Sequence, residues 1–239
     1  MFQMSNQLSL KLNGMSGGKI LDIGTGKGEF VEVLKKHLRD YDEIWAIDNN
    51  EKAINRARVH IIDPKVEFRV MDAGHLEFDD NSFDLVCLSN SLHHLKNIEK
   101  ILTEMKRVVK PKGMLLINEM YSDNQTPAQM SHVYFHHFSA KIARLKGIYH
   151  EETLKKDEIM GIVKKNDIQI LDYFSHGDYE IEKDEEKIYE LYDALNHQLE
   201  EVKSHPEYSV FAEEAADIKR WIECQGFTTA TELMIIGKK

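Results

Sequence analysis

The sequence predicts an α/β fold with a seven-stranded, mostly parallel sheet that has helices on both of its faces. Two observations support this prediction. Over residues 19–120, short apolar runs alternate with segments whose apolar residues recur every three or four positions, as expected for alternating strands and helices. The run at 83–88, FDLVCL, is apolar almost throughout, which is typical of a parallel strand that is buried on both faces.

Five strands and three helices are predicted in the first half of the chain. The strands cover 19–23, 43–47, 66–70, 83–88 and 114–118. The helices cover 29–38, 51–61 and 97–109, and Pro111 and Gly113 end the last of them. Strand–helix–strand units of this length favour right-handed crossovers, so we expect a parallel sheet with a helical layer on each side.

The second half of the chain predicts mainly helices, with two further strands. Helical periodicity is present at 131–146, 155–166, 184–202 and 211–222, and Gly226 follows the last segment as a stop signal. IQILDYF at 168–174 and TELMII at 231–236 are predicted strands. These two strands would complete a sheet of seven, and the helices near 184–225 would form an inserted cap.

The composition is that of a folded chain with an acidic balance. Its 239 residues are 42% hydrophobic and 30% charged, which suits one domain with a sizeable core. A formal net charge of −10 is the opposite of what a nucleic-acid-binding surface needs. With no apolar run of 18 residues and no signal-peptide pattern at the start, we expect no membrane span and a cytoplasmic location. The two cysteines, Cys87 and Cys224, exclude a disulfide framework.

A glycine-rich turn follows the first predicted strand. The segment DIGTGKGEF places glycines at 24, 26 and 28 between Asp22 and Glu29. Glycines let the backbone pass close to a ligand, and this turn would lie at the carboxyl edge where open α/β sheets bind ligands. A dinucleotide fingerprint, G-x-G-x-x-G, would need a third glycine at position 29, where an acid would repel a pyrophosphate. The turn therefore favours a ligand with an amine and no phosphate over a nicotinamide dinucleotide.

Acids also follow the next two predicted strands. Asp48 ends the second strand, where a carboxylate can accept hydrogen bonds from both hydroxyls of a ribose. Asp72 follows the third strand, and Ser89 and Asn90 follow the fourth. For either acid the alternative is an ordinary surface or turn position. The order of these residues along the chain favours a nucleoside-containing ligand.

Together, these stretches resemble the class I S-adenosylmethionine-dependent methyltransferases. The matching segments are ILDIGTGKGEF, AIDNN, VMDA, FDLVCLSNSLHHL and MKRVVKPKGMLLINE, in order over about residues 17–120. The resemblance implies a Rossmann-like fold with a reversed last strand, which TELMII fits, and S-adenosyl-L-methionine as the cofactor. The residues that it assigns to cofactor binding are Asp22, Gly24, Thr25, Gly26, Gly28, Asp48, Asn49, Asp72, Ala73, Ser89 and Asn90.

Histidines gather on the side where a methyl acceptor would bind. The chain has twelve, and six of them follow the fourth and fifth strands: His93, His94, His132, His136, His137 and His150. On a helical wheel His132 and His136 share an edge with Ser139 and Ala143, whose small side chains would leave room for a ligand. Apolar residues from Phe135 to Leu145 form another face, which we expect to pack on the fold, and His137 points away toward solvent.

We expect His94, Glu119, His132 and His136 to line the acceptor pocket as bases or orienting groups, with His150 as a further candidate. Two histidines four residues apart and a carboxylate also match divalent-metal ligand chemistry, so a metal site is an open alternative. The remaining alternative is a half-exposed polar helix without a ligand. Aromatic residues in the same region favour a small organic acceptor in an enclosed pocket.

The predicted function is a cytoplasmic enzyme that transfers a methyl group from S-adenosylmethionine to a small-molecule acceptor. The amide and exocyclic-amine methylation motif (N/D)PP(Y/F) is absent after the fourth strand, where the chain has SNSLHH. A cofactor-binding sensor or partner subunit without turnover, and a protein methyltransferase, are the alternatives. We expect a single domain over 1–239, with a cofactor-binding core at 17–120, acceptor and cap segments at 121–230 and a closing strand at 231–237.

Overall fold

The computed structural model describes residues 4–239 and confirms the predicted seven-stranded sheet. The strand order is β3-β2-β1-β4-β5-β7-β6. Neighbouring strands from β3 to β5 pair in parallel, whereas β7 pairs antiparallel with both β5 and β6. The strands are β1 (Lys19–Ile23), β2 (Glu43–Asp48), β3 (Val66–Val70), β4 (Phe83–Ser89), β5 (Val109–Met120), β6 (Gln169–His176) and β7 (Glu232–Lys238). The reversed strand is the closing segment of the chain, as predicted.

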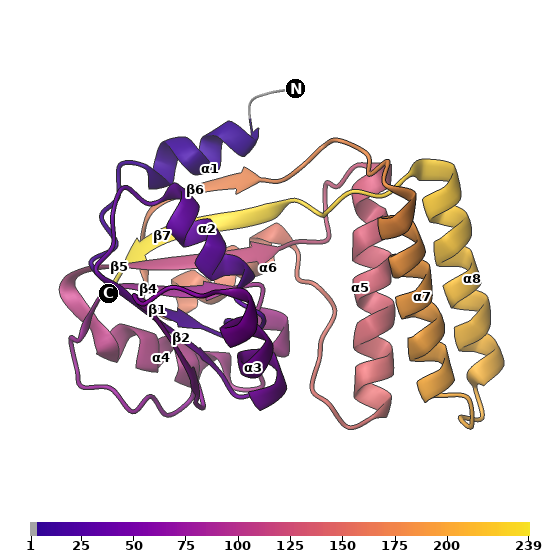
Figure 1. Cartoon of the computed structure of the whole chain (residues 1–239), viewed down its shortest axis with the longest axis horizontal. Coiled ribbons are helices and arrows are strands. Elements are labelled where there is room, and N and C mark those ends of the chain that lie inside the picture. Colours follow the sequence, from indigo (N-terminus) through magenta and orange to yellow (C-terminus); the bar gives the residue numbers. More distant parts are fainter. Residues whose placement is uncertain (1–3) are drawn as a thin grey trace.

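Helices cover both faces of the sheet and one of its ends (Figure 1). One core cluster joins the sheet to α1, α2 and α3, and a second joins its other face to α4 and α6. The helices are α1 (Met4–Leu12), α2 (Glu29–His37), α3 (Glu51–His60), α4 (Ile98–Val108), α5 (Pro127–Leu145), α6 (Lys156–Lys165), α7 (Glu185–Glu201) and α8 (Tyr208–Gln225), with a short 3-10 helix η1 (Leu92–His94) after β4. The sequence did not predict α1, and residues 1–3 of the expected 1–239 domain lie outside the described part of the chain.

The central strand β4 accounts for the apolar run at 83–88. Val86 and Leu88 belong to the core cluster on one face of the sheet, and Leu85 and Cys87 belong to the cluster on the other. Burial raises the pKa of the Cys87 thiol well above its usual value. Cys87 is therefore a packing residue with little thiolate at neutral pH.

Three helices, α5, α7 and α8, stand side by side beyond the end of the sheet toward which β5 points (Figure 1). They share a core of their own around Phe138, Leu195 and Ile218. This position corrects one expectation, because the apolar face of α5 packs on the other two cap helices, and Leu145 at its end is 42% exposed. α7 and α8 lie between β6 and β7 in the chain, which confirms the predicted insertion.

The start of α5 at Pro127 precedes the predicted boundary by four residues. Thr126 caps the helix: its hydroxyl accepts from the amide of Gln129, and the Gln129 side chain accepts from the amide of Thr126. This capping box, with proline in the first turn, is a start signal present in the sequence TPAQ. Within residues 4–239, the helices are all too short or too polar to span a lipid bilayer.

Candidate functional site

The glycine turn between β1 and α2 has backbone geometry that other residues tolerate poorly. Gly24 and Gly26 have φ values of 68° and 56°, in the left-handed region. A Cβ at Gly24 would also collide with the hydroxyl of Ser91. At Gly26 the nearest atom to a Cβ would be a Glu29 carboxylate oxygen 3.7 Å away, so this part of the turn borders open space. Gly28, at φ 91°, precedes the first residue of α2.

Asp22 lies below this turn, at the end of β1, and is 1% exposed. Among the described residues, neither its carboxylate oxygens nor the Thr25 hydroxyl has a hydrogen-bond partner of good geometry. Burial raises the pKa of Asp22 to about 7, the nearby Thr25 hydroxyl partly opposes the shift, and the charges of Asp48 and Glu29 add to it. A buried carboxylate without a partner is unusual and is the arrangement that a cationic ligand would complete.

Asp48, at the end of β2, fixes the backbone around the turn. Its Oδ2 accepts from the amide of Gly26 at 2.9 Å, and its Oδ1 accepts from the amide of Asn50 at 2.8 Å. Asn50 caps α3, so one carboxylate joins the glycine turn to the start of that helix. Asn49 lies between them and is exposed. A carboxylate has about four acceptor positions, so Asp48 keeps capacity for further hydrogen bonds.

Asp72 and Ala73 begin the loop after β3, and α4 holds this loop in place. Asp72 is exposed and its Oδ1 accepts from the amide of Gly74 at 2.9 Å. Farther along, the amide of Leu76 donates to Glu104, and Arg107 donates to the carbonyl oxygen of Leu76. The Arg107 guanidinium and the Leu76 amide lower the pKa of Glu104 to about 2. The loop is thus fixed by a charged pair on α4.

Ser89 and Asn90 are engaged in a polar network at the carboxyl ends of β4 and β5. The Asn90 Nδ2 donates to Glu232 Oε1 at 2.6 Å, and Asn118 Nδ2 donates to Glu232 Oε2 at 2.7 Å and to Ser89 Oγ at 3.1 Å. His176 Nε2 lies 2.7 Å from Asn118 Oδ1. Asn118, His176 and Glu232 were not predicted as site residues, although an asparagine in the apolar strand MLLIN is a signal for such a network.

Glu119, one residue further along β5, holds the segment after β4. Its Oε2 accepts from the amides of Ser91 and Leu92 at 3.0 and 2.9 Å. Its Oε1 lies 2.5 Å from Nδ1 of His93. Because a carboxylate only accepts hydrogen bonds, the proton of this pair lies on Nδ1 of the ring. Glu119 therefore orients His93 and fixes the start of η1.

His93, His136 and His150 form a compact cluster, in which each offers a ring nitrogen and these nitrogens lie within 4.8 Å of one another. Nε2 of His136 lies 3.0 Å from Nε2 of His150. The exposed ring of His94 lies 4.1 Å from that of His150 between centroids. Burial and the neighbouring imidazoles lower the pKa of His136 to about 2 and that of His150 to about 4. Both are therefore neutral at physiological pH.

The structure separates His132 from His136, which the helical wheel placed on one ligand-facing edge. His132 Nδ1 accepts from the amide of Ala230 at 3.0 Å, so this ring ties α5 to the segment before β7. Ser139 on the same edge is hydrogen-bonded to Gln198 of α7. The expectation of a solvated His137 is wrong, since its Nε2 lies 2.7 Å from the Thr153 hydroxyl and its side chain is 22% exposed.

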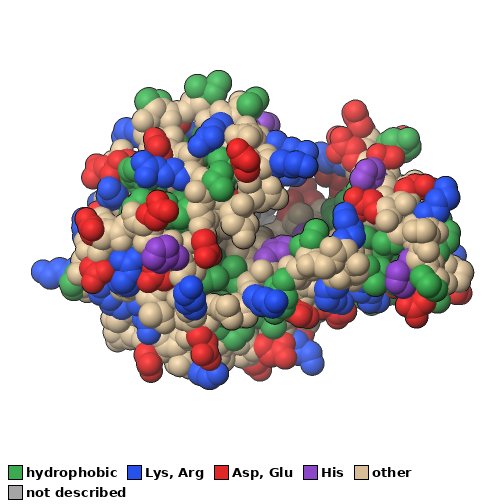
Figure 2. Space-filling model, turned by 90° about the horizontal axis from the view of Figure 1, so that it is seen from below, with side chains coloured by type: hydrophobic (Ala, Val, Ile, Leu, Met, Phe, Trp, Pro, Cys, Tyr) green, Lys and Arg blue, Asp and Glu red, His purple; other side chains and the backbone are tan. Residues whose placement is uncertain are grey.

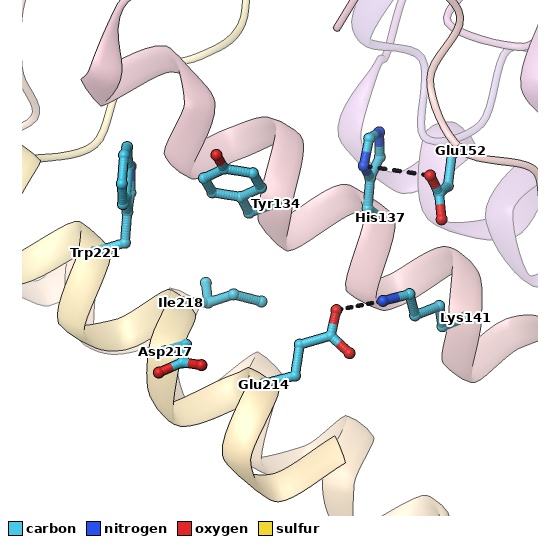
Figure 3. Close-up of a pocket in the computed structure, with 8 residues that line it drawn as sticks. All are labelled: Tyr134, His137, Lys141, Glu152, Glu214, Asp217, Ile218 and Trp221. Atoms are coloured by element: carbon cyan, nitrogen blue, oxygen red, sulfur yellow. Dashed lines mark hydrogen bonds and ion pairs between the residues drawn. The ribbon is translucent and has the colours of Figure 1, made fainter. Parts of the chain in front are cut away.

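A cavity of about 350 Å³ opens between α5 and α8, on another part of the cap (Figure 3). Its charged side chains are largely paired, with Lys141 Nζ 2.5 Å from Glu214 and His137 Nδ1 3.6 Å from Glu152. The cavity wall is made of Tyr134, His137, Lys141, Glu152, Glu214, Asp217, Ile218 and Trp221. None of the predicted cofactor or acceptor residues lines it. A separate hollow lies between the α/β body and the three-helix cap, with histidine at its margin (Figure 2).

Comparison with known sequences finds a family match in the first half of the chain. The family described as a methyltransferase domain matches residues 21–117. A ubiquinone/menaquinone biosynthesis C-methyltransferase from Cupriavidus pinatubonensis is 35% identical over 109 residues, which are 45% of this chain and 45% of that protein. The match thus spans less than half the length of the curated relatives. The family match at 21–117 contains the glycine turn and the strand-end acids.

Solved structures extend the similarity in fold to nearly the whole chain. A methyltransferase, described as putative, from Bacillus halodurans is 18% identical with a TM-score of 0.61, and the match covers 98% of this chain and 99% of that one. A Haemonchus contortus phosphoethanolamine N-methyltransferase, solved with phosphomonomethylethanolamine and S-adenosylhomocysteine, is 18% identical with a TM-score of 0.56. That match covers 98% of this chain and 53% of the other. At these identities the likeness establishes the fold.

Proposed function

We propose that this chain, a member of the class I S-adenosylmethionine-dependent methyltransferases, transfers a methyl group from S-adenosylmethionine to a small-molecule acceptor. The observation that carries the proposal is Asp22, a buried carboxylate without a hydrogen-bond partner among the described residues, directly below a glycine turn. An ammonium group bound there would stabilise the ionised carboxylate. S-adenosylmethionine supplies such a group on its methionine part.

The other strand-end residues fit the remaining parts of this cofactor. Gly24 and Gly26 allow the backbone to approach the methionine part, and Asp48 has acceptor capacity left for the ribose hydroxyls. We assign Asp72 and Ala73, on the loop that α4 fixes, to the adenine. When bound, S-adenosylmethionine would supply a methyl group that bonds to a lone pair of the acceptor, while the electron pair of the broken bond would stay on sulfur. Asn49, Ser89 and Asn90 complete the proposed surroundings.

The chain's own contribution to the reaction is alignment and, where the acceptor carries a proton, its removal. His136 and His150 form a cluster with His93, and the exposed ring of His94 lies 4.1 Å from that of His150 between centroids. Glu119 acts as a positioning residue through His93, and His132 positions the segment before β7. We therefore assign His94 and His136 to the acceptor side, and Glu119 and His132 to its support.

Two observations support a small acceptor over a macromolecule. The curated relative is a C-methyltransferase of ubiquinone and menaquinone biosynthesis, whose acceptors are small organic molecules. In addition, α5, α7 and α8 stand over the end of the sheet where the acceptor would bind, and α7 carries six acids against one lysine. Such a cap is poorly suited to a nucleic-acid backbone.

Calorimetric titration with S-adenosylhomocysteine tests the cofactor assignment. We expect one molecule bound per chain and no binding of NAD. Asp22→Asn should weaken S-adenosylhomocysteine at least tenfold, whereas Asp193→Asn, on the exposed surface of α7, should not. Binding of NAD in place of S-adenosylhomocysteine would overturn the proposal.

Turnover distinguishes the enzyme from a cofactor-binding sensor or partner subunit. Formation of S-adenosylhomocysteine would be followed with panels of phenols, quinols, thiols and amines. A peptide library would test for a protein acceptor. Methylation of a small molecule is the expected result. Tight cofactor binding without turnover of any acceptor would favour the sensor.

A further inference from the structure

We propose that His93, His136 and His150 bind one divalent first-row transition-metal ion, with the Glu119 carboxylate behind His93 as the orienting group. The three ring nitrogens already lie within 4.8 Å of one another, and Nε2 of His136 lies 3.0 Å from Nε2 of His150. Imidazole nitrogens bound tetrahedrally to one Zn²⁺ lie roughly 3.3 Å apart. A change of up to about 1.5 Å in the separation of these nitrogens would therefore complete the site.

His93 carries the strongest single indication of a missing ligand. Its Nδ1 donates to Glu119, which leaves Nε2 with a free lone pair. This Nε2 is buried and has no hydrogen-bond partner among residues 4–239, and the side chain is 1% exposed. A carboxylate on one ring nitrogen and a metal on the other is the usual arrangement of metal-ligating histidines. A metal ion would satisfy the atom that the fold leaves unpaired.

Two hydrogen bonds join the three segments that carry these rings. His93 lies in η1, and its carbonyl oxygen accepts from the amide of Glu151 at 2.8 Å. The carbonyl oxygen of His150 accepts from Arg144 of α5 at 2.7 Å. The loop that carries His150 is thus fastened both to η1 and to the helix that carries His136. This fixed arrangement distinguishes a built site from a chance meeting of exposed side chains.

The ligand chemistry indicates which ion would bind. Neutral imidazoles suit Zn²⁺, Fe²⁺, Co²⁺, Ni²⁺ and Cu²⁺, whereas Mg²⁺ and Ca²⁺ prefer oxygen ligands. Three protein ligands also leave a coordination position open, as in catalytic rather than structural zinc sites.

The open position gives the site a role that rests on the proposed function. Ser91, two residues before His93, has its hydroxyl 3.4 Å from the carbonyl oxygen of Gly24, so the cluster adjoins the proposed cofactor turn. A metal there would bind a hydroxyl, enol or thiol of the acceptor as its anion, while the released proton passes to water. The favoured acceptors are therefore small molecules with an ionisable oxygen or sulfur.

Titration of the full-length chain with Co²⁺ and Zn²⁺, after removal of metal by chelation, tests the site without any need for turnover. We expect one ion per chain, visible Co²⁺ absorption bands and displacement of Co²⁺ by Zn²⁺. His136→Ala and the conservative His150→Gln should each weaken binding by about 10- to 100-fold. His197→Ala, on the surface of α7 with a side chain 76% exposed, should bind as the unaltered chain does.

Failure to bind any of these ions stoichiometrically, or equal affinity in the His136→Ala and His150→Gln variants, would overturn the metal site. Circular dichroism of each variant shows whether the fold persists. S-adenosylhomocysteine binding to the metal-free chain is measured in parallel. Cofactor binding without metal binding overturns the metal site alone, whereas metal binding without cofactor binding overturns the proposed function alone.

Discussion

Nδ1 of His93 lies 2.5 Å from Oε1 of Glu119, and both side chains are 1% exposed. The same carboxylate accepts from the amides of Ser91 and Leu92 through its other oxygen. One buried acid on β5 therefore fixes both the backbone after β4 and the tautomer of the imidazole beyond it. This pair joins the sheet to the histidine cluster. A substitution that keeps the size of the Glu119 side chain can therefore test its hydrogen bonding separately from its packing.

Glu119→Gln should change the tautomer of His93 while keeping the fold. The glutamine oxygen can still accept from the two amides, but its NH₂ group would donate to Nδ1, so the ring proton would move to Nε2. We expect a loss of about 1–3 kcal/mol in the free energy of unfolding and a roughly 10- to 100-fold loss of metal affinity. Nitrogen NMR of the imidazoles identifies the tautomer directly. An unchanged Nδ1–H signal would contradict the inferred role of Glu119.

Asp22→Asn should stabilise the ligand-free protein at neutral and higher pH. The pKa of Asp22 is raised from 3.8 to about 7, so between these values the unfolded chain releases a proton that the folded chain keeps. The stability of the ligand-free protein should therefore fall as pH rises through this window, by up to about 4 kcal/mol, and then level off. Asparagine does not titrate, so the free energy of unfolding of the Asp22→Asn protein should not fall in this pH window.

Urea unfolding of both proteins at pH 5, 6, 7 and 8 checks the prediction, with the stability difference expected to grow toward pH 8. S-adenosylhomocysteine should reverse the order, because only the carboxylate pairs with its amino group. Parallel pH profiles for the two proteins would show that Asp22 is ionised in the ligand-free fold over this range. That result would contradict a raised pKa for Asp22.

Gly24→Ala should weaken cofactor binding at a moderate cost in stability. The residue has φ +68°, and a Cβ there meets the Ser91 hydroxyl. Left-handed strain costs of order 1–2 kcal/mol, and displacement of Ser91 would disturb the segment that Glu119 holds. We expect at least a tenfold loss of S-adenosylhomocysteine affinity by calorimetry. Gly14→Ala, where a Cβ would meet nothing within 4 Å, is the matched control and should bind normally.

The sheet and the glycine turn could be predicted because their signals are local. The apolar run of β4 reflects burial on both faces, and the alternate glycines of the turn reflect backbone angles that each residue needs by itself. Even the closing strand β7 was identified from six residues. Elements of this kind can be predicted from a short stretch of sequence alone.

The histidine cluster could not be predicted to the same degree, because it depends on contacts between distant segments. A helical wheel gives the angle between His132 and His136 but not the rotation of α5 against its neighbours. That rotation is set by the packing of Phe138 against α7 and α8 and by the bond from Ala230 to His132. Likewise, nothing in the pair His93-His94 indicates which ring turns inward, since the deciding partner, Glu119, lies 26 residues away from His93.

Arg107→Lys should loosen the loop that carries Asp72 and Ala73 without changing the charge of α4. Arg107 donates to the carbonyl oxygens of Leu76 and Phe78 at 2.9 and 2.7 Å and to Glu104 at 2.7 Å. A lysine ammonium has no planar fork and cannot make these bonds together. We expect a loss of about 1–2 kcal/mol in the free energy of unfolding and a several-fold weaker affinity for S-adenosylhomocysteine.

Urea unfolding and calorimetry measure these two effects, and amide hydrogen exchange over residues 73–80 locates them. The exposed Arg220 of α8, paired with Asp217, offers a control in which Arg220→Lys should be neutral. Faster exchange in the loop together with weaker binding would show that α4 presents the adenine side of the site through Arg107. If exchange over 73–80 stayed unchanged while binding weakened, the effect would have to pass through Glu104 alone, and the positioning role of Arg107 would be wrong.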